Sequence, residues 1–350
     1  MTTLLDYKYG SSNASSADTA IRKIIAETMV SESPFLSVLD FEELTDNNIS
    51  RQRMYFESDV QEHEVGGTWT IVNPTWQYRD SPLTVLGDNV TVDSFGALAS
   101  GDKEAALMAS NIMEKSRGMS RRFDKLAIYA GTTSTGGISN SNMVGLLTHI
   151  ARIEGATVTD LDGWLYSGND GAANNTQALF GVSGASVALS LAMIGALRDA
   201  VRPKATHMLM SRLMRRKVEA LCQAAGQNLV ILDEKAGQVI TKWGDVQILV
   251  NDQIKDNMDD STALVTDIAS YDYAQATAGG SDTSPIFCVS LAREHFTGIN
   301  GQGMIQVENL AGGGALENLD AKGKRIKAYL GTALRQHRSA AVLLNTNYGG

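Results

Sequence analysis

The stretch of sequence that decides the fold, residues 46–92, reads DNNISRQRMYFESDVQEHEVGGTWTIVNPTWQYRDSPLTVLGDNVTV. Its first part alternates, with Met54, Phe56 and Val60 on one face and mostly charged residues on the other. A period of two residues indicates a half-buried β-strand. The Gly66-Gly67 pair then breaks the strand, which predicts an extended β-hairpin.

The second part of this stretch carries two short aromatic runs, at residues 69–72 and 76–78, and returns through Val85, Val90 and Val92. An isolated two-stranded ribbon is only marginally stable in water. We therefore expect its apolar side to lie on another copy of the chain, which favours assembly over turnover of a substrate. The residues expected to make these inter-subunit contacts are Met54, Phe56, Val60, Trp69, Ile71, Trp76 and Tyr78.

A long helix is predicted directly after the hairpin, over residues 102–130. Asp102 and Glu104 fall in its first turn, where the helix dipole favours acidic side chains, and Gly131 suits the position just beyond its end. At 1.5 Å per residue such a helix is about 43 Å long, with Gly118 as a candidate bend. Its apolar stripe has helical spacing and consists of Met108, Ile112, Met119, Phe123, Leu126 and Ala130.

Shorter elements lie on both sides of this helix. Helices are predicted at residues 17–29, 187–201 and 214–225, the first ended by Pro34. Residues 132–186 are rich in Gly, Asn and Ser and allow no firm assignment. The mixture lacks regular βαβ alternation, so the class is α+β. Strands are predicted at 205–210, 228–232, 246–250, 263–268, 285–291, 304–307 and, with a break, 328–344.

Length and composition narrow the function. A chain of 350 residues predicts two domains. The formal net charge of −9 is the opposite of what a dedicated nucleic-acid binder carries. The start of the chain resembles no signal peptide and no apolar run suits a bilayer, so we expect a cytosolic chain without membrane contact. Cys222 and Cys288 lie in apolar patterns and are expected to be buried thiols.

Several motifs resemble chemical sites, but none is complete. Residues 131–136 have the glycine spacing of a phosphate loop but lack its Lys and follow a helix. Ser183 sits in an incomplete nucleophile elbow. The acids around His63 favour a solvated hairpin edge over a cation site. We therefore expect no catalytic residues, no cofactor and no metal. The basic clusters at 212–217 and 322–338 are expected to be solvated or to pair with acids of neighbouring copies.

Taken in order, the elements resemble the major capsid proteins of tailed bacteriophages, which share the Hong Kong 97-like fold. The order of the elements carries the resemblance over nearly the whole chain. It implies an α+β capsid fold divided into an N-terminal arm at 1–45, an extended β-hairpin loop at 46–98, a peripheral domain with the spine helix at 99–186, an axial domain at 187–310 and return strands at 311–350.

The resemblance also implies partners. The chain would form hexamers and pentamers with itself in a virion shell assembled in the host cytoplasm. Double-stranded DNA would be enclosed through non-specific contact, and a portal and a decoration protein would be further partners. Only about 45 residues precede the loop, so we expect a separate scaffolding protein. No lysine lies between Lys23 and Lys103, so the loop cannot form the Lys–Asn isopeptide bond of some members.

Two alternatives stay open at the level of sequence. An encapsulin, a cellular shell of the same fold that encloses an enzyme, would show the same elements, although this chain exceeds the length expected for one. A cytosolic hydrolase using Ser183 is the remaining alternative, and it would need a His and an Asp that the sequence does not single out.

Overall fold

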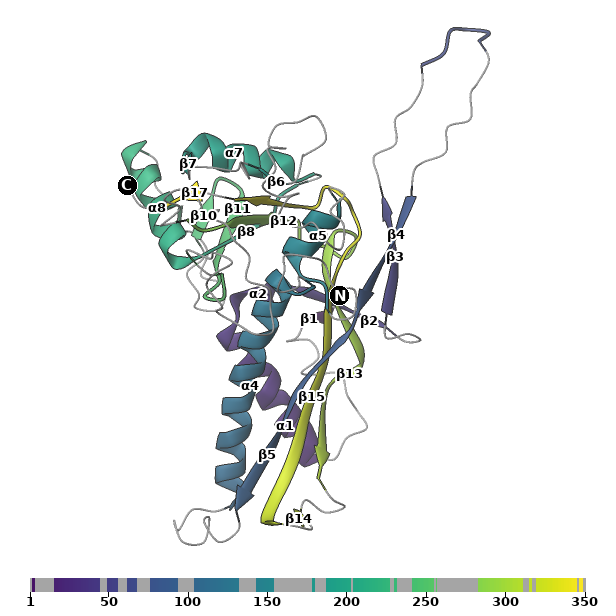
Figure 1. The fold of residues 1–350 in the computed structure, drawn as a ribbon, viewed down its shortest axis with the longest axis vertical. Helices are drawn as coiled ribbons and strands as arrows, with labels where there is room; N and C mark the ends of the chain where they lie inside the picture. The colour runs from purple at the N-terminus through teal and green to yellow at the C-terminus, as the bar shows by residue number, and fades with distance from the viewer. Residues whose placement is uncertain are drawn as a thin grey trace, which may run out of the picture.

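The computed structural model describes residues 2–3, 16–44, 49–55, 62–67, 76–93, 104–131, 143–153, 178–179, 187–202, 204–226, 230–231, 241–254, 256, 283–310, 315–316, 319–344 and 346–348. Two large sheets organise them. A long, narrow sheet with two helices along it forms the lower part of Figure 1, and a second sheet with shorter helices forms the upper part.

The long sheet has six strands, and β15 is its central strand. β13 and β5 both pair with β15 in antiparallel fashion, and β2 runs parallel to β13. The strands are β1 (Thr2–Thr3), β2 (Asp40–Leu44), β5 (Thr84–Asp93), β13 (Phe296–Asn309), β14 (Ala315–Leu316) and β15 (Leu319–Leu334).

The position of β5 differs from the one that the sequence predicts. The sequence predicts that its valines return within the extended loop, but β5 pairs with β15 over its full length, from Thr84 opposite Leu330 to Asp93 opposite Ala321. The side chains of Val90 and Val92 are buried in the body of the protein, and only Val85 is exposed. An alternating strand is equally suited to a hairpin or to a sheet edge, and burial against α4 favours the sheet.

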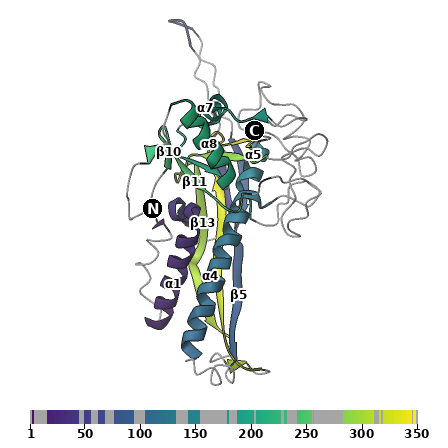
Figure 2. The ribbon, with the colours of Figure 1, turned by 90° about the vertical axis from the view of Figure 1, so that its left-hand side faces the viewer.

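Helices α1 (Ser16–Glu32) and α4 (Glu104–Tyr129) pack against each other along this sheet (Figure 2). The spine helix α4 has 26 residues, about 39 Å at 1.5 Å per residue. It ends where the sequence predicts, with Gly131 at a φ of 87°. Its stripe is confirmed: Ile112, Met119 and Phe123 are buried.

Residues 16–44, which lie before the hairpin in the segment expected to be an N-terminal arm, contribute to the core of their own subunit. α1 is one helical turn longer than predicted and ends at Glu32; Ser33 then caps α2 (Pro34–Val38), with its Oγ accepting from the Leu36 backbone N–H. Phe35, Leu36 and Leu39 are almost completely buried. These contacts fix the N-terminal segment over residues 16–44 on its own subunit.

The second sheet has seven strands in the order β6-β16-β12-β8-β11-β10-β9. Helices α5 (Leu146–Ile153), α7 (Leu191–Ala200) and α8 (Arg212–Ala224) pack near it. The strands are β6 (Ala178–Leu179), β8 (His207–Met210), β9 (Val230–Ile231), β10 (Thr241–Trp243), β11 (Val246–Val250), β12 (Ile286–Val289) and β16 (Ala340–Leu343).

Both faces of this sheet are covered, which explains why β12 and β16 are apolar at every position. On β8 and β12, Met208, Met210 and Cys288 join the cluster under α7 and α8. The intervening residues Leu209 and Phe287 join the cluster that holds α2, α4 and α5. The two parts of the molecule therefore share the core on this face of the sheet, whereas the residues under α7 and α8 form a separate cluster.

Several sequence expectations differ from the structure in detail. β13 lies inside the stretch expected to be axial, yet its pairing with β15 and β2 places it in the long sheet. Val187 lies in β7 (Val187–Ala188), which pairs with β17 (Thr346–Asn347), and not in α7. β10 is a strand that the sequence pattern does not predict. The strand expected at 263–268 lies outside the described residues.

Candidate assembly surfaces

The first candidate surface is a ribbon made of β3 (Ile49–Tyr55) and β4 (Trp76–Pro82), hereafter the β3–β4 ribbon. The two strands pair only with each other, antiparallel, from Ile49 opposite Pro82 to Tyr55 opposite Trp76. In Figure 1 the ribbon rises beside the upper part of the molecule and points away from it. Both outer edges of this two-stranded sheet therefore lack a strand partner among the described residues.

The ribbon leads to a described tip at residues 62–67. Val65 is fully exposed, with 108% relative exposure, and Glu62 and Glu64 are exposed beside it. Gly66, at a φ of 89°, supports a turn that is closed by a 2.9 Å hydrogen bond from the Gly67 N–H to the Glu64 carbonyl. The tip thus presents two carboxylates and one apolar side chain to solvent.

Three of the seven residues predicted to make inter-subunit contacts, Met54, Trp76 and Tyr78, lie on the ribbon. The register pairs Met54 with Gln77, whereas Trp76 pairs with Tyr55 and Tyr78 pairs with Arg53. Sequence reasoning did not single out Tyr55, which only the strand register places opposite Trp76. The other four, Phe56, Val60, Trp69 and Ile71, lie outside the described residues.

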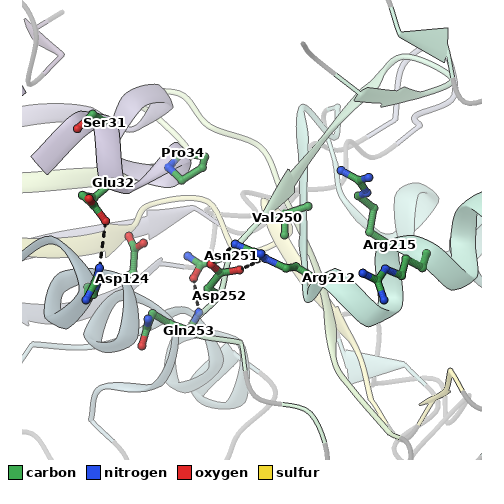
Figure 3. Close-up of a pocket in the computed structure, with 12 residues that line it drawn as sticks. Ser31, Glu32, Pro34, Asp124, Arg212, Arg215, Val250, Asn251, Asp252 and Gln253 are labelled. Carbon is green, nitrogen blue, oxygen red and sulfur yellow. Dashed lines mark hydrogen bonds and ion pairs between the residues drawn. The ribbon is translucent and has the colours of Figure 1, made fainter. Parts of the chain in front are cut away.

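The second candidate surface is a cavity of about 780 Å³, hereafter the arginine cavity. It lies between the lower helices and α8 (Figure 3). Four arginines and three carboxyl groups contribute to its lining, together with Asn251. They are Arg121, Arg212, Arg215, Arg216, Glu32, Asp124 and Asp252.

Ion pairs engage some of these charges. Arg212 donates twice to Asp252, with both N···O distances at 2.6 Å, and Arg121 lies 3.4 Å from Glu32. Arg215 and Arg216 make no ion pair with a described residue. The sequence identified this basic cluster at 212–217, but only the fold shows that Arg121 joins it from the spine helix.

Asp124 is a buried carboxyl group at this cavity, 5% exposed. Burial raises the pKa of Asp124 to about 7, and the charge of Asp252 adds to this rise. The hydroxyl of Ser33 donates a hydrogen bond to Oδ1 at 2.5 Å, which lowers the pKa and so opposes the rise. Asp124 therefore exchanges its proton near neutral pH, unlike an ordinary aspartate. Its position couples the α1–α2 junction to the spine helix.

Part of the second basic cluster is bonded within the chain. Lys327 pairs with Glu308 at 2.7 Å, and Arg325 donates to Asn89 at 2.8 Å. Arg335 forms an ion pair with Glu42, and Arg293 forms a second ion pair with Glu42 at an N···O distance of 3.0 Å. Burial lowers the pKa of Arg335. These pairs hold β5, β13 and β2 on β15, so this cluster stabilises the long sheet.

The structure adds no support for the motifs that the sequence analysis rejected as chemical sites. Residues 132–136 and Ser183 lie outside the described part of the chain. Within that part, no three His, Cys, Asp or Glu side chains gather closely enough to hold a metal ion. Cys222 and Cys288 are confirmed as free buried thiols, and burial raises the pKa of Cys288 to about 12.

One Ser–His contact is present among the described residues. The Ser290 hydroxyl lies 3.0 Å from His295 Nδ1 in the turn between β12 and β13. Ser290 is only 2% exposed, and its backbone N–H and carbonyl bond to Ser339 and Phe296. A nucleophile must reach its substrate, so this pair has a structural role in the turn.

Comparison with solved structures confirms the expected fold class. The capsid of a native GTA particle matches with a TM-score of 0.56 at 13% identity, covering 91% of this chain and 90% of that chain. An encapsulin complex from Synechococcus elongatus PCC 7942 gives 0.54 at 12%, covering 89% and 87%. The capsid of cyanophage Pam1 gives 0.53 at 11%, covering 89% of each chain.

No protein-family model and no curated protein matches the sequence. At these identities the likeness is one of fold, and the chain has the Hong Kong 97-like fold of shell-forming proteins over about nine-tenths of its length. Within the described residues, no helix combines the length and apolar character needed to cross a bilayer.

Proposed function

We propose that this chain is a major capsid protein, which assembles through hexamers and pentamers into the icosahedral head shell around the double-stranded DNA of a phage. The observation that carries the proposal is the β3–β4 ribbon, which extends from the body with two open edges. The capsid likeness of the fold, over about 90% of the chain, supports it.

The physics of the ribbon favours assembly. Two strands alone are marginally stable, and open strand edges pair readily with another chain. Obligate interfaces bury about 2,000–5,000 Å² and would supply the stabilisation that the ribbon lacks by itself. The predicted contact residues on the ribbon and beyond it, from Met54 to Tyr78, are proposed to lie in this interface.

The proposal extends to location and partners. The chain would assemble in the host cytoplasm and reside in the virion, with a separate scaffolding protein, a portal and a decoration protein as partners. Contact with DNA would be non-specific, because the net charge of −9 disfavours tight binding of phosphates.

Removal of the ribbon tests this function. Arg51 and Asp80 are directly paired, so residues 52–79 can be replaced by Asn-Gly, the two-residue turn that suits a hairpin. Both large sheets stay intact in this variant. We expect a folded monomer that forms no particles in negative-stain microscopy, whereas the unaltered chain forms shells.

The matched control keeps the ribbon and its tip and carries only Glu114→Gln at an exposed site on the spine helix, which should keep assembly. Particles of normal size from the 52–79 deletion would refute the role of the ribbon. Failure of the unaltered chain to form particles, even with its scaffolding partner, would refute the proposed function itself.

An encapsulin shell is the second candidate, favoured by the matching encapsulin complex. The two functions differ in what the shell encloses. Nuclease-treated particles of a capsid protein should retain double-stranded DNA when they are assembled in infected cells, whereas an encapsulin should retain a cargo protein. Mass spectrometry and nucleic-acid extraction of the same particles separate the two.

A further inference from the structure

The arginine cavity carries more positive charge than its own acids neutralise. Arg215 lines one side on α8, and Glu32 and Asp124 lie across the cavity from it (Figure 3). Asp252 is held by Arg212, and Glu32 is shared between Arg121 and Arg117.

The carboxyl that remains in the lining, Asp124, is only partly ionised near neutral pH because its pKa is about 7. The guanidinium groups of Arg215 and Arg216 are therefore left without a carboxylate among the described residues. Guanidinium groups pair most favourably with carboxylates, through two parallel hydrogen bonds.

A further donor lies in the wall of the same cavity. Asn251 is 2% exposed, and its Oδ1 accepts from the Gln253 backbone N–H at 2.8 Å. Its side-chain nitrogen is buried and donates to no acceptor among the described residues. Buried donors are normally satisfied, so the Asn251 amide lacks an acceptor that an oxygen of a ligand would supply. Two arginines and one amide point to an anionic ligand rich in oxygen.

The described tip has the complementary chemistry. Glu62 and Glu64 are exposed carboxylates that directly precede the turn, and Val65 in the turn is fully exposed. The ribbon rises on one side of the molecule in Figure 1, whereas α1 and α8, which line the cavity, lie on the other side. The tip therefore meets an arginine cavity only on a second copy.

We infer that the arginine cavity of one subunit receives the acidic tip at Glu62–Gly67 of a neighbouring subunit. This inference rests on the proposed shell function and specifies its contact. The carboxylates of Glu62 and Glu64 pair with Arg215 and Arg216. A projection on one side and a receptor on the other make a head-to-tail interface, which closes into rings when the rotation between copies allows it.

The composition of the cavity favours a peptide carboxylate over a nucleic-acid phosphate. Arg215 and Arg216 stand together on α8 and match the two carboxylates of one tip, whereas the acids between the arginines interrupt the continuous basic track that a phosphate backbone needs. A cavity of about 780 Å³ also fits a turn of a few residues and not a duplex.

A charge exchange tests the contact. Reversal of the cavity, with Arg215→Glu and Arg216→Glu, should raise the subunit concentration needed for assembly about tenfold or more, and so should reversal of the tip, with Glu62→Arg and Glu64→Arg. The four substitutions together should restore assembly. Because each double variant alone weakens the shell, the rescue separates a direct contact from misfolding.

The matched control reverses a cation of the same part of the molecule outside the cavity, with Lys242→Glu. This control should assemble as the unaltered chain does. Circular dichroism of each unassembled variant checks that its helices and strands are intact.

A pair of engineered cysteines gives a direct readout. Glu62→Cys combined with Arg216→Cys should yield disulfide-linked multimers on a non-reducing gel of oxidised particles, whereas Glu62→Cys with Lys242→Cys should not. Native Cys222 and Cys288 are buried and do not compete. Where the rescue and the crosslink disagree, the crosslink decides.

The failures are distinguishable. If the unaltered chain forms no shells, the proposed function falls. If it forms shells but the variant with Glu62→Cys and Arg216→Cys gives no intersubunit bond, the docking of the tip is wrong. If the Arg215→Glu and Arg216→Glu variant assembles normally but loses nucleic acid from its particles, the cavity binds phosphate and the inference is overturned.

Discussion

At the scale of single residues, Asp124 is the group most sensitive to its surroundings. It lies on the spine helix and bonds to Ser33, the residue that ends one helix and begins the next. A carboxyl with a raised pKa in the folded state binds its proton more tightly there than in the unfolded chain. Folding is therefore favoured at low pH by this group, and that contribution is lost as pH rises from about 4 through about 7.

The substitution Asp124→Asn should remove this dependence, because an amide has the same shape and no charge. We expect the melting temperature of the unassembled variant to exceed that of the unaltered chain by several degrees at pH 8, and the difference to vanish near pH 4. Calorimetry at the two pH values measures it. Glu114→Gln, an exposed site on the same helix, is the control and should show no such trend.

Substitution of two glycines by alanine should change the stability of the subunit in opposite directions. A Cβ at Gly87 on β5 would clash with the backbone oxygen of Ile326, which cannot move without disturbing the sheet. At Gly118 on the spine helix a Cβ meets nothing within 4 Å. Gly87→Ala should therefore destabilise the subunit by about 1–3 kcal/mol, and Gly118→Ala should stabilise it by about 0.5–1 kcal/mol.

Urea unfolding of the two variants under the same conditions measures both effects. If both substitutions proved neutral, the close approach of β5 to β15 would be wrong, and so would the solvent-facing position of Gly118.

At the scale of elements, the sequence predicts those that a local pattern defines. The spine helix has a long apolar stripe with an acidic start and a glycine end, and the structure confirms it to within two residues at each end. β11 has the predicted bounds, because an apolar run between turn residues marks a strand buried on both faces.

Pairing between distant strands was not predictable. β5 is an alternating strand whether it pairs with β4 or with β15, and about 230 residues separate it from the latter. For the same reason the sequence predicts only part of the arginine cavity. The basic cluster on α8 is visible in the sequence, since its arginines lie within one helix. Only the tertiary fold brings Arg121, Asp124 and Asn251 to that cluster.

The pairing makes a prediction for the ribbon. β15 bonds to a strand on each side, whereas β3 and β4 bond only to each other. In the unassembled subunit the ribbon amides should exchange hydrogen much faster than those of β15, since local opening exposes them. In assembled shells the ribbon should become protected. Hydrogen exchange with mass spectrometry, before and after assembly, tests this prediction; a ribbon as protected as β15 in the free subunit would contradict it.

At the scale of the whole molecule, a single packed body carries one projecting element, the β3–β4 ribbon, among the described residues. The shared core joins both large sheets into one body, and the N-terminal helices belong to that body. Among the described elements the ribbon extends from it, so the ribbon is the element most suited to join one subunit to the next. A shell built this way owes its cohesion to many copies of one non-covalent contact.

The absence of an amine on the ribbon leads to the last prediction. An isopeptide bond needs a lysine, and the sequence has none from residue 24 to residue 102, a range that contains the whole ribbon and its tip. Mature particles should therefore dissociate completely in denaturing detergent and give one band at the mass of a single chain, 37.5 kDa. A ladder of multimers that survives both detergent and reductant would show a covalent bond from another lysine, and would contradict a shell held by non-covalent contacts alone.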